Sequence, residues 1–458
     1  MAARPHAVAH AARIPVDLAA AGLLALAVPA IFLHITYQPE VTIGLGSTSA
    51  GITLADAAVL WVAAAALVAG RRLGFEPLRA GRWIWLTGAA FLALVFVATF
   101  HPLLWQQHYR FATHLVTAAK FAEYGLLAVS LPLILRGRQH VELLLGALVA
   151  WSCAASAWGF LQFCGLVNEF EGKRPLQREP SFLGEHDFAA LSGVSASVAL
   201  AVLVLGPRSR LERRLAWAGA VAGAVGLVVS AAIAGALGLA AAVAALLVGR
   251  RRGTLTRQRT LACAGLAAVA LVGCVTMRSG GIVSSLKALG INRTEHKQKD
   301  VASYAHRSLL AYIGLRIFEA HPVAGVGWQG SEEPENFRPY LTDAHRKFPS
   351  EPDIAFPSAR HAWGVQNAYL QTLTDLGLVG FAMLAALFAA GLMFSARAAL
   401  RAPPELAVAA TCGLLWLLVA AGTWNGLGLV AGIPLDAVTW LAFGLAAAGA
   451  GWLERARA

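Results

Sequence analysis

The feature that most constrains this chain is a series of apolar runs, each about as long as a membrane-spanning helix. A helix needs about 20 mostly apolar residues to cross the hydrocarbon core of a bilayer. We place such runs at residues 17–37, 53–70, 83–100, 113–135, 141–166, 187–205, 215–230, 233–249, 260–277, 367–394, 405–423 and 433–452. The prediction is an all-α polytopic membrane protein with about twelve transmembrane helices. The first run also has the small residues of a signal-peptide cleavage site, "ALAVPA", but an uncleaved helix keeps the topology below in phase.

The composition supports a membrane protein and argues against nucleic acid as a partner. Of the 458 residues, 58% are hydrophobic and 14% are charged. Soluble chains carry about a quarter charged residues. The net charge of +12 would suit nucleic acid, but the basic residues lie in short clusters between the apolar runs. That placement is typical of the positive-inside rule, so the expected large-scale partner is the lipid bilayer.

The basic clusters recur in every second link between the apolar runs. After the second, fourth, sixth, eighth and tenth runs, arginines gather at residues 71–82, 136–138, 208–214, 250–259 and 397–401. By the positive-inside rule these links and both termini face the cytoplasm. The chain then divides into transmembrane helices 1–9 with short loops (residues 1–277), one large external loop (278–366) and transmembrane helices 10–12 (367–458).

The large external loop differs sharply in composition from the rest of the chain. It is rich in Arg, Lys, His, Glu and Pro, and loops of this length without a function are uncommon. Its stretch "RSLLAYIGLRIFEAHP" predicts an amphipathic helix lying in the membrane interface. The apolar stripe of this helix comprises Leu309, Leu310, Ile313, Ile317 and Phe318. A basic loop outside the membrane indicates an anionic ligand at the outer surface.

The first external segment with candidate binding residues is "FEGKRPLQREPSFLGEHDFAALSG". Arg174 and Arg178 precede His186, which lies at the start of the sixth run. One interpretation is a loop whose basic residues meet lipid phosphates. The other is a diphosphate clamp, for which the planar, bidentate guanidinium of arginine is suited.

The second segment runs through the large loop into the tenth apolar run. Arg307 lies on the expected amphipathic helix, and the "HPVAGVGWQG" that follows ends this helix with proline and glycine. Gly325 and Gly327 would permit a tight turn close to a ligand. His345 and His361 flank a proline-rich passage, where each is either a surface histidine or a base.

No metal or cofactor is expected. The sequence has no HExxH, P-loop or GxSxG motif and no recognisable metal-binding cluster. The five cysteines lie in apolar runs without CxxC spacing, which indicates small hydrophobic residues. Within the fourth run, Lys120 and Glu123 lie three residues apart, so we expect an ion pair on one face of that helix.

The two external segments resemble the O-antigen ligase and O-antigen polymerase superfamily of bacterial envelope proteins. The family has an Arg, an amphipathic helix, an "hP-x-x-GvG" turn and then "HN-x-yL-x-x-l-x-x-x-G-x-x-G". Here "RSLLAYIGLRIFEAHPVAGVGWQG" and "QNAYLQTLTDLGLVG" match that pattern, and "REPSFLGEHDFAA" is similar to the family's Arg-containing segment before a central span. The matching residues are Arg307, Pro322, Gly325, Gly327, Asn367, Tyr369, Leu370, Gly377 and Gly380.

The resemblance implies a membrane glycosyltransferase at the outer, periplasmic face of the bacterial plasma (inner) membrane. Such enzymes move a glycan from an undecaprenyl-diphosphate carrier to a hydroxyl of a glycan or lipid-glycan acceptor, without a metal ion. Arginines would neutralise the leaving diphosphate. The implied residues for binding the diphosphate or the glycan are Arg174, Arg178, His186, Arg307 and Tyr369. The motifs leave the choice between ligase and polymerase open.

Two positions depart from the family pattern. The slot before Asn367 usually holds a histidine, and here it holds Gln366, which can orient a hydroxyl but cannot remove its proton. His361 is the nearest histidine along the chain, so we expect it to act as the base, with Gln366 and Asn367 as the other catalytic residues. The family's arginine in an "S-x-S-R-G" turn between two central spans is also missing, because residues 230–235 read "SAAIAG".

Two other classes of function stay open. A transporter or flippase of lipid-linked sugars would place polar residues at the middle of the membrane on broken helices, often in repeated halves. This chain has no internal repeat, and its polar residues concentrate in one outer loop. A non-catalytic partner in envelope assembly is the third interpretation, and the two departures from the family pattern keep it open.

Overall fold

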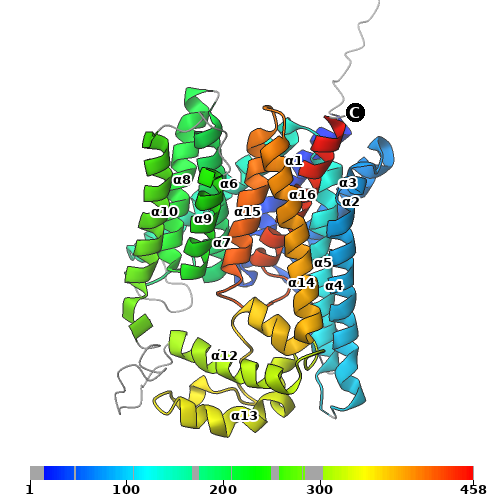
Figure 1. Cartoon of the computed structure of the whole chain (residues 1–458), viewed down its shortest axis with the longest axis vertical. Coiled ribbons are helices and arrows are strands. Elements are labelled where there is room, and N and C mark those ends of the chain that lie inside the picture. Colours follow the sequence, from blue (N-terminus) through cyan, green and yellow to red (C-terminus); the bar gives the residue numbers. More distant parts are fainter. Residues whose placement is uncertain are drawn as a thin grey trace, which may run out of the picture.

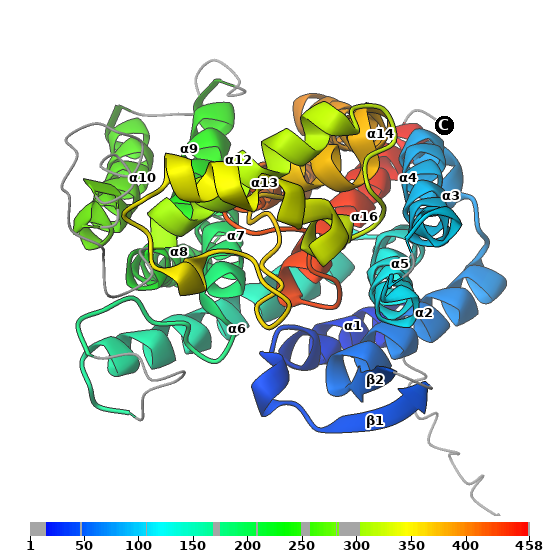
Figure 2. The same cartoon turned by 90° about the horizontal axis from the view of Figure 1, so that it is seen from below.

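The computed structural model is a bundle of long helices with a layer of two further helices across one end (Figure 1). It describes residues 15–45, 48–106, 108–167, 175–207, 209–248, 257–280, 282–283 and 303–456. The helices α12 (Ser303–Ala320) and α13 (Pro334–Lys347) form this outer layer and cross the end of the bundle (Figures 1 and 2).

Every apolar run coincides with a helix of the bundle. These helices are α1 (Val16–Ile31), α2 (Leu54–Leu73), α4 (Arg82–Phe100), α5 (Phe111–Ile134), α6 (Arg138–Phe163), α7 (Glu185–Leu205), α8 (Arg210–Ser230), α9 (Ile233–Val248), α10 (Arg257–Met277), α14 (Ala368–Arg401), α15 (Ala407–Thr423) and α16 (Pro434–Arg455). Eight of them, α2, α4, α5, α6, α7, α10, α14 and α16, are long and apolar enough to cross a membrane, and α1, α9 and α15 are shorter apolar helices. The mostly helical architecture with several membrane-spanning helices is confirmed, while the count of twelve spans and the side on which each loop lies stay predictions.

Two helices, α7 and α16, occupy the centre of the bundle. Their apolar windows are 89% and 100% buried, whereas that of the peripheral α10 is 22% buried. Small residues permit this close packing: a Cβ added at Gly444 of α16 would lie 2.7 Å from the carbonyl oxygen of Ala128 in α5. A central α7 gives a fixed position to His186 in its first turn.

An antiparallel hairpin between α1 and α2 was absent from the all-α prediction. Strand β1 (Glu40–Leu45) pairs with β2 (Thr48–Thr53), with Val41 opposite Ile52. The sequence did contain a signal, because β-branched residues lie on both sides of the dipeptide Gly46–Ser47, and this two-residue spacing is typical of hairpins. A search for 20-residue apolar runs does not detect segments this short.

The outer layer has a hydrophobic core of its own, separate from that of the bundle. The apolar stripe of α12 is buried in it, except for the half-buried Phe318. The stripe packs against residues of α13 and of the loops on either side of α13: Val326, Phe337, Ala344, Phe348 and Phe356. The amphipathic helix is therefore confirmed. Its apolar stripe packs against α13 and not against lipid, and its place in the membrane interface stays a prediction.

A break in α14 joins the bundle to the outer layer. At Gly377 the backbone has φ 65° and ψ −164°, so the helix stops and restarts there. A break of this kind leaves backbone groups on both sides without their partners in the helix. The carbonyl oxygens of Thr374 and Asp375 accept hydrogen bonds from the backbone N–H groups of Val326 and Gly327, at 3.2 and 2.9 Å.

The second half of α14 returns two hydrogen bonds to the same turn. The backbone N–H of Leu378 donates to the carbonyl of Pro322 at 2.8 Å, and that of Val379 donates to the carbonyl of Val323 at 3.2 Å. We call these four reciprocal hydrogen bonds between the turn 322–327 and the break in α14 the backbone latch. The latch satisfies groups that would otherwise be left unpaired at the end of the bundle.

The glycines of the "HPVAGVG" turn are explained by this latch. Gly325 has φ +69°, and a Cβ there would lie 2.3 Å from the backbone carbonyl of Asp375. Gly327 has φ +105°, and its Cβ would lie 2.9 Å from the carbonyl oxygen of Ala98 in α4. The turn is therefore tight, as predicted, but its glycines bring backbone against backbone instead of against a ligand.

Candidate active site

A cavity of about 160 Å³ lies between the bundle and the first turns of α12. Five parts of the chain meet there: α7, the α8–α9 turn with the start of α9, the end of α10, α12 and the segment after α15. We call it the arginine cavity. The residues that line it are His186, Ala232, Ile233, Ala234, Leu237, Arg278, Tyr304, Arg307, Asn425 and Gly426.

Arg307 connects this cavity with the loop that precedes α14. Its Nε donates to Gln366 Oε1 at 3.0 Å, and its Nη2 donates to His186 Nε2 at 2.9 Å. Because a guanidinium only donates, His186 Nε2 accepts, and the neutral imidazole carries its proton on Nδ1. Three residues that the sequence singled out, from three separate segments, therefore lie in contact.

A second arginine, Arg278, faces the same cavity from the end of α10. The guanidinium carbon of Arg278 lies 5.0 Å from the centre of the Tyr304 ring, and that of Arg307 lies 5.9 Å from it, so one ring contacts both cations. Arg278 Nε is buried without a hydrogen-bond acceptor among the described residues. Burial, followed by the charge of Arg278, lowers the pKa of Arg307. Two neighbouring cations, with no carboxylate among the described residues that line the cavity, favour an anionic ligand.

Sequence reasoning used Arg278 only as the start of the large loop. One signal was available, because a basic residue directly after the ninth apolar run is contrary to the charge rule on the expected outer side. A lone arginine, however, says nothing of its neighbours. Its contact with Tyr304 depends on how α12 lies against the bundle, which no local pattern encodes.

Arg178 lies near the arginine cavity and is already paired. Its guanidinium forms an ion pair with Glu185, which directly precedes His186 in the chain. Arg178 is close enough to His186 to act on it electrostatically, as Arg307 and Arg278 do. It therefore adds positive charge near the cavity without lining it. Arg174, the other arginine predicted in this segment, lies outside the described residues.

His361 and Asn367, two of the predicted catalytic residues, do not line the cavity. His361 is exposed and stacks on Trp363, with ring centres 5.9 Å apart. Asn367 caps α14, since its Oδ1 accepts the backbone N–H of Leu370 at 3.0 Å. Its side-chain amide also donates to the backbone carbonyl of the lining residue Asn425 at 3.2 Å, so Asn367 reaches the cavity through this contact.

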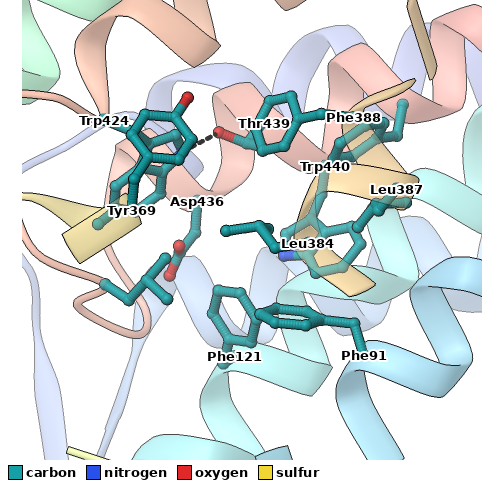
Figure 3. A pocket seen from close by; sticks show the side chains of 13 residues that line it. Phe91, Phe121, Tyr369, Leu384, Leu387, Phe388, Trp424, Asp436, Thr439 and Trp440 are labelled. Atoms are coloured by element: carbon teal, nitrogen blue, oxygen red, sulfur yellow. Dashed lines mark hydrogen bonds between the residues drawn. The ribbon is translucent and has the colours of Figure 1, made fainter. Parts of the chain in front are cut away.

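Tyr369 belongs to a different cavity, enclosed within the bundle (Figure 3). Its hydroxyl donates to the carbonyl of Ala421 at 2.6 Å. Most of the lining is aromatic or aliphatic, and the hydrogen bond from Trp424 Nε1 to Thr439 Oγ1 (2.8 Å) crosses one side of it. The volume of about 20 Å³ has room for about one water molecule, not a sugar.

A cluster of acidic residues holds the outer layer against α5 and α14. Glu333 Oε1 accepts from Arg110 Nε at 2.8 Å and lies 2.6 Å from His114 Nε2. Burial alone would raise the pKa of Glu333, but the hydrogen bonds with His114 and Arg110 outweigh it and lower this pKa. For the neighbouring Glu332, burial and then the charge of Asp375 raise the pKa to about 7. We call Glu332, Glu333 and Asp375 the acidic cluster.

Asp375, on the last turn of α14 before the break, completes this cluster. Its carboxylate accepts from the backbone N–H of Ser331 at 2.9 Å and from Gln371 Nε2 at 3.1 Å. The contacts of Glu333, and that of Asp375 with Ser331, thus join the outer layer to the bundle. The contact of Asp375 with Gln371 lies within α14. Within the described part of the chain, no group of three or more His, Cys, Asp or Glu side chains could hold a metal ion.

A comparison with protein families found a match over part of the chain. The family model for O-antigen ligase matches residues 218–385, from α8 through the outer layer to the second half of α14. The matched range includes Arg278, Arg307 and Gln366. This finding confirms the resemblance to the O-antigen ligase and polymerase superfamily. No curated protein matches the chain.

Proposed function

We propose that this chain, whose residues 218–385 match the O-antigen ligase family, is a membrane glycosyltransferase that takes its glycan from a lipid diphosphate. The donor in this proposal is an undecaprenyl-diphosphate-linked glycan, and the acceptor is a hydroxyl of a glycan or lipid-glycan. The reaction takes place at the outer face of the bacterial plasma membrane, with the outer layer in the periplasm and both termini in the cytoplasm.

The observation that carries the proposal is the pair of guanidinium groups in the arginine cavity. Arg278 and Arg307 come from separate elements and face one cavity, with Tyr304 against both. Bringing two half-buried cations together costs free energy unless an anion offsets their repulsion. A diphosphate offers several oxygens to planar guanidinium donors and so fits this site.

Arg278 also supplies the charge that the family pattern places elsewhere. The family's missing arginine belongs to the turn that reads "SAAIAG" here, which is the α8–α9 turn. Ala232, Ile233 and Ala234 of that turn line the arginine cavity. A guanidinium from the end of α10 thus enters the same cavity that an arginine on this turn would face. In this chain the positive charge would therefore come from Arg278 of α10 and not from the α8–α9 turn, but it would enter the same cavity.

In the proposed reaction, the acceptor oxygen bonds to the anomeric carbon of the glycan while the bond from that carbon to the diphosphate oxygen breaks. The negative charge that develops on the departing lipid diphosphate falls beside Arg278 and Arg307. Fixed positive charge at the place where negative charge develops lowers the barrier. The guanidinium groups take the part that a divalent cation plays in other phosphate chemistry.

The proton of the acceptor hydroxyl goes to His186 in this proposal. His186 Nε2 carries the free electron pair and now accepts from Arg307. A diphosphate oxygen that binds Arg307 Nη2 would release this nitrogen to act as a base. Gln366 keeps Arg307 in place through Nε, and Asn367 positions Asn425, so both are positioning residues. His361 lines no part of this cavity.

The test is a transfer assay with purified protein in bilayers, a lipid-diphosphate-linked glycan donor and a defined acceptor. Arg278→Ala and Arg307→Ala should each lower the rate about 10²–10³-fold, as the loss of a charge-stabilising donor does. Arg316→Ala is the matched control, because Arg316 also lies on α12 but is paired with Glu319 on its exposed side. Unfolding midpoints of all variants separate lost function from lost fold. Near-normal transfer by both cavity variants would refute the diphosphate site.

The broken helix α14 is the feature that a transporter would use, and its contacts do not favour transport. Transporters expose the backbone of a broken helix to a substrate cavity. At Gly377 the backbone groups are instead taken up by the backbone latch, within the protein. The break therefore supports a joint between two layers. The same assay, run with lipid-anchored glycan acceptors and with donor-linked glycan acceptors, separates a ligase from a polymerase.

A further inference from the structure

Figure 1 shows α3 and the C-terminal end of α16 at the end of the bundle opposite the outer layer, and a second basic pocket is formed there. Its volume is about 600 Å³, and it is formed by the short helix α3 (Pro77–Ala80), the start of α4 and the last turns of α14 and α16. We call it the basal pocket. The residues that line it are Arg79, Ala80, Arg82, Trp83, Met393, Phe394, Arg397 and Glu454.

The arginines of the basal pocket are not used by the fold. The side chains of Arg79, Arg82 and Arg397 form no hydrogen bond or ion pair within the described residues, and the guanidinium of Arg82 lies 5.4 Å from the centre of the Trp83 ring. With Glu454 as the only acidic lining residue, the pocket carries a net formal charge of +2, from three arginines and one glutamate.

Neighbouring arginines at the same end of the bundle show the contrast. Arg136 donates from Nη1 to the carbonyl of Leu73 at 2.7 Å and from Nη2 to that of Gly74 at 2.5 Å, which satisfies the end of α2. Arg455 donates to the carbonyl of Arg136 at 3.1 Å. These two arginines hold helix ends together, whereas those of the basal pocket keep all their donors for a ligand.

The pocket lies at the ends of helices that are able to cross a membrane. Its walls belong to the first turn of α4 and the last turns of α14 and α16, which are three of the helices able to cross a membrane. Trp83 is 50% exposed and Met393 is 39% exposed, so apolar side chains border the arginines. Tryptophan is enriched at membrane–water interfaces, and basic pockets between membrane helices bind the phosphate groups of lipids.

We propose that the basal pocket binds the headgroup of an anionic phospholipid with two phosphodiesters, of the cardiolipin type. Its two negative charges match the net charge of the pocket, and the exposed Trp83 and Met393 lie where acyl chains would leave the headgroup. A bound headgroup would connect α4, α14 and α16 at this end of the bundle. The site is independent of the proposed transferase reaction, which lies at the other end.

The experiment measures the thermal unfolding midpoint of the purified full chain in detergent, titrated with four probes: cardiolipin, phosphatidylglycerol, phosphatidylethanolamine and inorganic diphosphate. We expect cardiolipin to raise the midpoint at the lowest concentration, phosphatidylglycerol to act more weakly, and phosphatidylethanolamine to have no effect. Inorganic diphosphate would also stabilise the chain through the arginine cavity, so its effect should be the same in the wild type and in variants of the basal pocket. A diphosphate effect that the basal-pocket variants weaken would mean a site for soluble anions and would overturn the proposal.

Matched variants locate the effect. Arg79→Gln, Arg82→Gln and Arg397→Gln should each weaken the cardiolipin response about fivefold, since each basic residue at a membrane surface contributes about that factor. The double variant Arg71→Gln/Arg72→Gln, with two exposed arginines from the end of α2 that do not line the pocket, should respond like the wild type. Equal responses of pocket and control variants would refute the site.

Glu454→Gln should strengthen cardiolipin binding, a result that a misfolded variant would not give. Removing the only acidic lining residue raises the net charge of the pocket from +2 to +3. The cardiolipin response should then shift to lower concentration, again by about fivefold. A damaged protein would lose the response, and an unchanged or weaker response in a variant of normal unfolding midpoint contradicts the proposal.

Discussion

The outer layer contacts the bundle in two places, and the charged side chains differ between them in whether they have partners. In the arginine cavity, Arg278 and Arg307 face an open space that is lined by no acidic residue of the described part of the chain. In the acidic cluster, Glu333 is engaged by Arg110 and His114 at 2.8 and 2.6 Å. The first contact keeps its charge for a ligand, and the second uses its charge to hold the layer in place.

This difference separates residues that serve activity from residues that serve the fold. The backbone latch belongs with the acidic cluster, because Asp375 takes part in both. Variants of the latch and the cluster should therefore change the unfolding midpoint, and variants of the arginine cavity should change the transfer rate. The predictions below test that division, beginning with the largest effect.

Gly377→Ala should have the largest effect, the loss of folded protein. Gly377 has φ +65°, which favours glycine, and an added Cβ would lie 2.2 Å from the carbonyl oxygen of Val323. The latch cannot form around that contact, so the outer layer loses its joint with α14. The measurement is the yield of monodisperse protein in detergent. Gly146→Ala is the control, since a Cβ there meets nothing within 4 Å, and equal yields for both variants would contradict the latch.

His186→Ala should lower transfer about 10²–10⁴-fold, the range for a lost general base, while leaving the unfolding midpoint nearly unchanged. His361→Ala, on the exposed side chain that stacks on Trp363, should change the rate less than about twofold, within the range of surface substitutions. Single-turnover rates at saturating donor are the measurement. If His361→Ala were the damaging variant, the base would come from the loop before α14, as the sequence suggested, and not from α7.

Gln366→Glu should give Arg307 an ion-pair partner within the protein, as the charged residues of the acidic cluster have. Gln366 Oε1 accepts from Arg307 Nε at 3.0 Å, so a carboxylate here would pair with Arg307 as Glu333 pairs with Arg110. The donor would then compete with an internal anion, and we expect its KM to rise about tenfold, equivalent to about 1.4 kcal/mol, with a smaller change in kcat.

Gln366→Ala separates the loss of the hydrogen bond to Arg307 from the effect of an added negative charge. It removes the hydrogen bond to Arg307 without adding a charge, so its KM should rise less than that of Gln366→Glu. The two variants would behave alike if Gln366 acted only by positioning Arg307. That outcome would contradict the view that the free positive charge of the cavity is what binds the donor.

Parts of this structure that depend on local pattern could be predicted from the sequence. The apolar runs mark the helices because membrane-spanning length and apolar composition are properties of a single segment. Arg307, Gln366 and His186 were found through motifs, and the structure brings them into contact. Their roles in catalysis or binding stay predictions, since contact in the protein does not demonstrate a reaction.

Features that depend on which segments become neighbours could not be predicted in this way. The expected ion pair of Lys120 with Glu123 is wrong, because Lys120 Nζ donates to Asp56 Oδ2 of α2 at 2.9 Å. The stripe of α12 indicated a buried side, but apolar periodicity does not distinguish a lipid partner from a protein partner such as α13. Arg278 belongs to the site because α12 packs so that Tyr304 contacts it, and this packing is not encoded near Arg278 in the sequence.

The smallest expected effect concerns pH and compares two adjacent glutamates of the acidic cluster. The folded-state pKa of Glu332 is about 7, above its ordinary value of 4.5, because burial and Asp375 disfavour the carboxylate. A raised pKa means that the folded protein binds its proton more tightly, so the contribution of Glu332 to stability is full below pH 4.5 and lost as pH rises to about 7. Glu332→Gln should therefore raise the unfolding midpoint at pH 8, by roughly 2 °C, and leave it unchanged at pH 4.5.

Glu333 should show the opposite sign, because its hydrogen bonds with His114 and Arg110 lower its pKa despite burial. A lowered pKa gives stability above the ordinary value of 4.5 that is lost as pH falls through the folded-state pKa. Glu333→Gln should thus lower the midpoint at pH 8 and make less difference in acid, measured by thermal unfolding across pH 4 to 8. Because both side chains precede α13, a shared sign for the two variants would mean that the cluster responds to net charge alone, and that the pairing of Glu333 does not hold the layer.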